Sequence, residues 1–234
     1  IIWTTTPWTI PANKALAFNS NIEYSLLKID SLKYFKDQKI VVASNLINSI
    51  VKSCEIDNHK VLKTFKGSEF KDTICSHPFL KMNFSNDIPM LEASFVDLEQ
   101  GTGIVHCAPS HGPDDFNLCL KNNIPSSYTV DNAGLYTKEI PYFSGTHIFK
   151  ADKLVIEKLK EQNKLLKDDK LHHSYPHSWR SKAPLIYRAT PQWFISMEKN
   201  ALREKAIKAI NNTSFYPEKG KDRLLSMIEG RPDW

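Results

Sequence analysis

Two short stretches of the chain carry side chains that could do chemistry together. The first stretch holds four threonines within six residues, Thr4, Thr5, Thr6 and Thr9. The second, about a hundred residues later, holds His106, His111, Asp114 and Asp115. Hydroxyl groups both donate and accept hydrogen bonds, and a carboxylate binds an ammonium group through a charge-assisted hydrogen bond. Together the two stretches indicate a polar pocket for an amino group and a water molecule.

Hydrolysis of an activated ester needs little more than such a pocket. A fixed water, donors for the developing oxyanion and a group that holds the substrate are sufficient. Asp115 is the candidate for holding an α-ammonium group, because a free aspartate with a pKa near ~3.9 is ionised at neutral pH. The chain has no G-x-S-x-G elbow, and its spacing indicates no nucleophile–base pair. Direct attack by water is therefore the simpler mechanism.

Each of these residues also has a structural interpretation. Threonines beside a proline often satisfy the backbone of a turn, and Asp114 and Asp115 could only complement a helix dipole. His106 could be a hydrogen-bonded core histidine, and His111 could fix a loop. A third alternative is a metal site made of His106, His111 and Asp115, although no fourth ligand is evident.

The elements that must position these residues are mainly strands and short helices. Alternating and β-branched residues predict strands over 24–29, 39–43 and 103–107, the last delivering His106. Pro7 and Pro11 are expected to prevent a helix after the threonines. Ser44 is expected to cap a short helix, and Pro113 with the acidic pair predicts a helix from 113 to about 122. Apolar spacing predicts further helices over 150–167 and 198–210.

This pattern predicts a mixed α/β fold with a closed or strongly curved sheet. After residue 169 the sequence becomes aromatic, locally basic and interrupted by prolines. We therefore expect two parts, a core over 1–170 and a second segment over 171–234.

Composition narrows the class of protein without deciding its function. The chain has 234 residues, 41% of them hydrophobic, and a formal net charge of +5, which suits an acidic partner but is weak support for one. No apolar run reaches the ~20 residues of a membrane span. The four cysteines form no C-x-x-C pair, which indicates free thiols in a reducing cytoplasm. Both ends resemble cuts through a longer protein.

The two stretches also resemble a known family. Trp3 to Asn13 reads W-T-T-T-P-W-T-x-P-A-N, and Gly101 to Asp115 reads G-T-G-x-V-H-x-A-P-x-H-G-x-D-D. In this order and at this separation they resemble the editing (CP1) insertion of class I aminoacyl-tRNA synthetases, above all of the isoleucyl type. The segment 175–197 and the last five residues are similar to the return of that insertion toward the catalytic domain. Ser178 stands where the family commonly has cysteine.

The resemblance implies a β-barrel-like editing domain and a role for each residue. Asp115 would anchor the α-ammonium of a misattached amino acid. Thr5 and Thr6 would place the hydrolytic water and the terminal adenosine, with Thr4 and Thr9 lining the same wall. His106 would limit the size of the side-chain pocket, so that valine fits and isoleucine does not. Trp8 would pack near the adenosine, and His111 would belong to the substrate-binding wall.

The implied activity is the hydrolysis of mischarged Val-tRNA(Ile), with valyl-adenylate as a second substrate. Such a second sieve is needed because a methylene group is worth only ~1–3 kcal/mol of discrimination, a limit for which the isoleucyl-type synthetases are themselves the standard example. The implied partners are the 3′ CCA end of tRNA(Ile) and the rest of a synthetase chain, with no membrane. No cofactor is expected in this domain, since ATP and Mg²⁺ would act in an absent catalytic domain. The alternatives are a valyl-type editing domain, a non-catalytic tRNA-binding module and a metal-dependent hydrolase.

Overall fold

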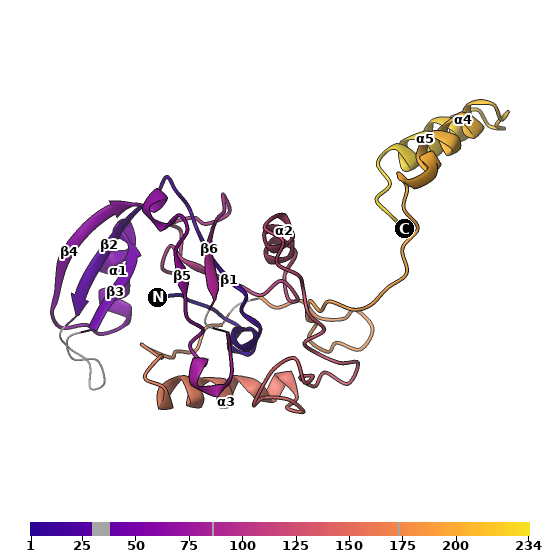
Figure 1. Cartoon of the computed structure of the whole chain (residues 1–234). Helices are drawn as coiled ribbons and strands as arrows, with labels where there is room; N and C mark the ends of the chain where they lie inside the picture. Colours follow the sequence, from indigo (N-terminus) through magenta and orange to yellow (C-terminus); the bar gives the residue numbers. More distant parts are fainter. Residues whose placement is uncertain (30–37, 86, 173) are drawn as a thin grey trace. The chain divides into compact units, whose positions relative to one another are not determined.

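The chain forms two compact units, residues 1–189 and residues 190–234. The computed structural model describes residues 1–29, 38–85, 87–172 and 174–234 (Figure 1). Each unit has its own helices, and the first unit contains all of the described strands. The boundary expected near residue 170, between an editing core and a segment that returns toward a catalytic domain, stays a prediction.

The strands of the first unit lie in two sheets (Figure 1). One sheet has the order β5-β6-β1-β7 and the other the order β3-β2-β4. In the first sheet β1 runs parallel to β6 and antiparallel to β7. The bounds are β1 (Ala15–Phe18), β2 (Glu23–Ile29), β3 (Gln38–Ala43), β4 (His59–Lys66), β5 (Ile74–Cys75), β6 (Ile88–Glu92) and β7 (Val105–Cys107). With the helices, these sheets confirm the mixed α/β fold.

Helices follow and connect the strands of the first unit, and two more α-helices belong to the second unit (Figure 1). The α-helices are α1 (Ile47–Ser53), α2 (Pro113–Lys121), α3 (Ile148–Glu161), α4 (Leu202–Asn211) and α5 (Lys219–Glu229). Short 3₁₀ helices are η1 (Pro7–Ala12), η2 (Ser44–Leu46), η3 (Gly67–Phe70), η4 (Leu80–Met82) and η5 (Lys199–Ala201). No helix among the described residues is both long and apolar enough to cross a membrane.

Two expectations about helix starts were wrong. Pro7 and Pro11 do not prevent a helix: Pro7 is the first residue of η1, where its missing N–H costs no bond, and the φ of about −65° that proline imposes fits a short 3₁₀ helix. Ser44 makes no capping hydrogen bond; its Oγ lies 2.8 Å from the Oγ of Ser25, on the neighbouring strand β2. The chain instead enters α1 through the 3₁₀ turn η2.

Two other helices are shorter than the apolar spacing indicates. The helix expected over 150–167 ends at Glu161, just before Asn163 takes a left-handed φ of 55°. The helix expected from residue 198 begins as α4 at Leu202, because Asn200 and Ala201 have φ values of 58° and 53°. Left-handed backbone cannot continue a right-handed helix, and apolar periodicity does not report it.

The site rests where the apolar cores of the first unit meet β7. Buried residues of η1 pack with α3 in one core, and Cys107 of β7 packs with β1 and α2 in another. β7 is held in place by the turn before it: Gly103 has a φ of +78°, and a Cβ there would lie 2.5 Å from the Cβ of Ala43. The hydroxyl of Tyr24 donates to the carbonyl of Gly103 at 2.7 Å. A glycine is therefore required to bring β7 close to the three-stranded sheet.

Candidate functional site

The threonine stretch forms one wall of hydroxyls along the start of η1. The Oγ1 atoms of Thr4 and Thr6 lie 3.3 Å apart, and those of Thr6 and Thr9 lie 3.5 Å apart. Thr9 also donates its hydroxyl proton to the carbonyl of Thr6 at 2.9 Å. The tight 3₁₀ turn therefore brings three of the four hydroxyls into one connected row.

This wall meets the second stretch at His106. The Nε2 of His106 lies 3.0 Å from the Oγ1 of Thr9, and both residues are nearly enclosed, with 8% and 6% of their surface exposed. His106 is placed there by β7, where it pairs with Leu16 of β1. Burial lowers the pKa of His106 to about 4, helped by His111 and His77 nearby. The imidazole is therefore neutral at physiological pH.

Trp8 and His111 form a second contact between the two stretches. Their rings meet edge to face with centroids 4.7 Å apart. The Nδ1 of His111 lies 3.1 Å from the carbonyl oxygen of Tyr187, and its Nε2 lies 2.9 Å from the hydroxyl of Thr129. Burial also lowers the pKa of His111. Trp8 is buried, so its indole belongs to the core as well as to this wall.

Asp115 lies in the first turn of α2 and faces back toward the end of β7. Its Oδ2 accepts a hydrogen bond from the backbone N–H of Ala108 at 2.8 Å. Burial is the main cause that raises its pKa to about 6; the Ala108 N–H lowers the pKa, and the neighbouring Asp114 raises it. Among the described residues neither an ion pair nor a partner for the other carboxylate oxygen is found. Asp115 is therefore a half-buried acid with one oxygen held by the backbone.

The structure thus brings most of the predicted residues together, by different degrees of contact. Thr9 touches His106 and Trp8 touches His111, whereas Asp115 is linked to His106 only through Ala108, two residues further along the chain. Thr5 is exposed, and its hydroxyl has no hydrogen-bond partner in the part of the chain that the structure describes. Their roles toward a substrate stay predictions.

In the part of the chain that the structure describes, three residues outside the predicted set hold η1 in place. The carboxylate of Asp152 on α3 accepts the N–H of Trp8 at 2.9 Å, and the hydroxyl of Tyr136 donates to the Trp8 carbonyl. The Nε2 of His77 lies 3.0 Å from the carbonyl oxygen of Ile10. All three lie far from η1 in sequence and belong to no motif, so sequence spacing gives no signal for them.

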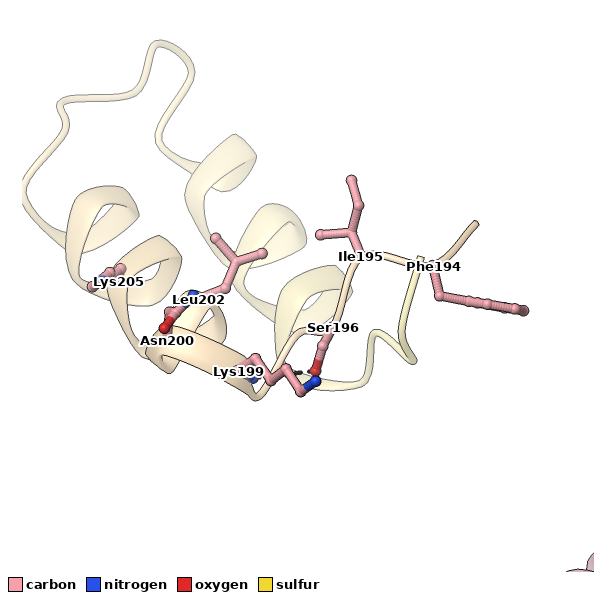
Figure 2. Close-up of a pocket in the computed structure, with 7 residues that line it drawn as sticks. All are labelled: Phe194, Ile195, Ser196, Lys199, Asn200, Leu202 and Lys205. Carbon is pink, nitrogen blue, oxygen red and sulfur yellow. Dashed lines mark hydrogen bonds between the residues drawn. The ribbon is translucent and has the colours of Figure 1, made fainter. Parts of the chain in front are cut away.

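Two cavities lie apart from the threonine row. One, of about 110 Å³, lies beside η1 and is lined by Asn13, His77, Thr129 and Glu139 among others. The larger, of about 390 Å³, belongs to the second unit and lies between residues 194–196 and the start of α4 (Figure 2). It shares no residue with the predicted site, so its size is no argument for that site. No group of three or more metal-binding side chains is found among the described residues.

Comparison with known proteins identifies the family. The sequence pattern described as tRNA synthetases class I (I, L, M and V) matches residues 15–234. The chain belongs to this family. Over all 234 residues it is 65% identical to an isoleucine–tRNA ligase of Pelagibacter ubique (strain HTCC1062) and 45% identical to one of Francisella tularensis subsp. tularensis (strain WY96-3418). It spans 26% and 24% of these two relatives, about a quarter of their length.

Solved structures support the fold of this class I synthetase chain. The GlLeuRS-CP1 crystal structure matches with a TM-score of 0.55 and 14% identity, covering 71% of this chain and 83% of that one. The editing domain of the P. knowlesi cytosolic leucyl-tRNA synthetase matches with a TM-score of 0.50 and 13% identity, covering 68% and 80%. At such low identity the likeness concerns the fold, which is that of the CP1 editing domains, as expected from the motifs.

Proposed function

We propose that this chain is the proofreading part of an isoleucine–tRNA ligase and hydrolyses the ester of mischarged Val-tRNA(Ile). The observation that carries the proposal is the contact between Thr9 and His106, supported by that between Trp8 and His111. These contacts join the two stretches, about a hundred residues apart, that supply the hydroxyls and the acid. The proposal also draws on the isoleucine–tRNA ligases to which the whole chain is similar.

Asp115 is the group that would hold the α-ammonium of the misattached amino acid. One of its oxygens is fixed by the Ala108 N–H, which orients the carboxylate and leaves the other oxygen for the ligand. Its raised pKa is the cost of keeping a carboxylate half-buried without a cation beside it. A bound ammonium group supplies that missing charge, since a charge-assisted hydrogen bond favours the ionised acid.

The hydroxyls would position the attacking water and the terminal adenosine. Thr5 is suited to a ligand because its hydroxyl has no partner among the described residues, while Thr6 lies within the connected row. Water attacks the ester carbonyl, the ester C–O bond breaks, and the ribose hydroxyl leaves with a proton. The products are valine and tRNA(Ile). The parent enzyme would attach isoleucine with ATP and Mg²⁺ elsewhere in its chain, in the cytoplasm, and this domain would need no cofactor.

His106 would discriminate between amino acids by the size of their side chains. A neutral, enclosed imidazole is a rigid wall that leaves room for valine and excludes the extra methylene of isoleucine. The net charge of +5 favours the approach of the acidic CCA end. Valyl-adenylate would enter the same pocket, because it carries the same aminoacyl group.

Release of labelled amino acids from Val-tRNA(Ile) and Ile-tRNA(Ile) tests the proposal, both with this chain and with the synthetase that contains it. We expect valine to be released and isoleucine to be retained. Binding of tRNA with no release would instead indicate a non-catalytic module, and loss of release on chelation a metal-dependent hydrolase. Preference for a mischarged tRNA(Val) would indicate a valyl-type domain.

A further inference from the structure

Among the described residues, three histidines contact η1, and two of these are held at both ring nitrogens. The Nδ1 of His77 accepts the N–H of Phe79 at 3.1 Å, so its proton must lie on Nε2, which donates to the Ile10 carbonyl. The Nδ1 of His111 faces the Tyr187 carbonyl, which can only accept. Its proton must therefore lie on Nδ1, and its Nε2 accepts from the hydroxyl of Thr129. In His77 and in His111, hydrogen bonds at both ring nitrogens fix the tautomer and the orientation of the ring.

His106 differs from the other two because it has one anchor. Its Nε2 contacts the hydroxyl of Thr9 at 3.0 Å. Its Nδ1 is buried and has no hydrogen-bond partner among the described residues. The orientation of this ring therefore depends on Thr9 alone, apart from packing.

Counting protons at Thr9 decides which nitrogen of His106 carries hydrogen. The hydroxyl of Thr9 has one proton, and it is directed at the carbonyl of Thr6 at 2.9 Å. Its lone pairs are then free to accept from an Nε2–H group of His106. In the other arrangement the hydroxyl donates to Nε2, the bond to the Thr6 carbonyl is lost, and an N–H group is buried at Nδ1 without an acceptor. That arrangement has one hydrogen bond fewer, and orphaned buried N–H groups are rare.

We propose that Thr9 is a positioning residue that fixes His106 in the Nε2–H tautomer and in one ring orientation. This inference rests on the proposed function in assigning His106 the size limit of the pocket. Thr9 then sharpens that limit without touching the reacting atoms: it stops the imidazole from turning away from the amino acid side chain. The hydroxyl of Thr9 is itself held within the threonine row, because its Oγ1 lies 3.5 Å from that of Thr6, which in turn lies 3.3 Å from that of Thr4.

The test starts from the side-chain ¹⁵N spectrum of the 234-residue chain with labelled histidine. We expect a pyrrole-like Nε2 and a pyridine-like Nδ1 for His106. Thr9→Val keeps the shape of the side chain and removes its hydroxyl, so the His106 signals should move toward a mixture of tautomers. Thr9→Ser should restore the single tautomer. Thr129→Val is the matched control, because it removes one of two anchors of His111 and should leave the His106 signals unchanged.

The selectivity of hydrolysis gives the second readout. The ratio of kcat/KM for valyl over isoleucyl ester should fall about tenfold in Thr9→Val, the worth of roughly one hydrogen bond, and recover in Thr9→Ser.

A proton on Nδ1 in the unsubstituted chain, or Thr9→Val spectra with an unchanged single tautomer, would overturn the inference. The first measurement needs no variant, so misfolding of Thr9→Val leaves it decisive. The expected spectra with no hydrolysis of either ester would refute the proposed function while leaving the tautomer assignment standing.

Discussion

The two sides of the candidate site satisfy their polar groups in different ways. On the η1 side, Thr9 and His106 are enclosed and bond to each other, and burial lowers the pKa of His106 to about 4. On the α2 side, Asp115 is half-buried with one bonded oxygen, and burial raises its pKa to about 6. Burial disfavours the charged form in both cases, but only Asp115 is mostly charged at physiological pH, because its pKa stays below 7.

This difference suggests two roles: Thr9 and His106 form a wall of the pocket, and Asp115 is a group that binds the ligand. On the η1 side, Thr9 and the neutral His106 hydrogen-bond to each other, so that this side forms an uncharged wall, which suits the discrimination of side-chain size. On the α2 side, Asp115 has no ion-pair partner among the described residues, which suits the binding of an ammonium group. Substitutions on the two sides should therefore change different quantities: the discrimination between amino acids on the η1 side, and the overall rate on the α2 side.

The largest expected effect comes from removing the acid. Asp115→Ala should lower kcat/KM for release of valine from Val-tRNA(Ile) by roughly a hundredfold, because truncating one partner of a buried charge pair costs about 2–5 kcal/mol and each ~1.4 kcal/mol is tenfold. The loss should be equal for any amino acid that enters. Asp114→Asn is the matched control, since Asp114 is the exposed neighbour on the same helix turn and should keep most of the activity. Retention of full activity in Asp115→Ala would remove Asp115 from the mechanism.

A smaller effect, of a different kind, is expected from the wall. His106→Ala should let isoleucine enter, so that Ile-tRNA(Ile) is hydrolysed and the preference for valine falls roughly ten- to a hundredfold, since a methylene is worth ~1–3 kcal/mol. The measurement is deacylation of both charged tRNAs side by side. His77→Ala removes another buried histidine, which hydrogen-bonds to backbone groups and packs against the rings of Phe79 and Phe84. If it relaxed selectivity as strongly, or if His106→Ala left isoleucine untouched, the size-limit role would be wrong.

The support of η1 gives a third prediction, on stability. Asp152→Ala leaves the N–H of the buried Trp8 without its acceptor and should lower the free energy of unfolding by about 1–3 kcal/mol. Asp152→Asn keeps an acceptor oxygen and should lose less. Urea denaturation of the three proteins checks this. Equal stability of Asp152→Ala and the unsubstituted chain would show that Tyr136 and His77 hold η1 without Asp152.

Sequence patterns predicted the local elements better than the contacts between them. Proline at the first position and two acids placed the start of α2 correctly at Pro113, because these preferences are local. The motif also included His106 and Thr9, whose side chains lie 3.0 Å apart. The supports of η1 could not be predicted, because Asp152, Tyr136 and His77 reach it through the tertiary fold. The left-handed backbone at Asn163 and Asn200 shortens two helices, and apolar periodicity does not report backbone conformation of this kind.

The smallest expected effect is the pH dependence that Asp115 imposes. With a pKa of about 6 the acid is mostly protonated at pH 5 and mostly ionised at pH 7, so the rate of valine release should rise about tenfold over that interval. Asp114→Asn should move the midpoint to lower pH, because Asp114 contributes to the upward shift. A rate that is flat between pH 5 and 7 would mean that the ionised carboxylate is not the binding form.

The same shift has a consequence for stability with the opposite sign. A raised pKa means that the folded chain holds the Asp115 proton more tightly than the unfolded chain does. Its contribution to the free energy of unfolding is therefore greatest below the ordinary value of 3.8 and is lost as the pH rises through about 6. Asp115→Asn should abolish this fall. The pH range in which the free energy of unfolding falls is thus the range in which Asp115 gains the charge that binds an ammonium group. Saturation with a valine ester analogue should restore the free energy of unfolding that is lost in this range.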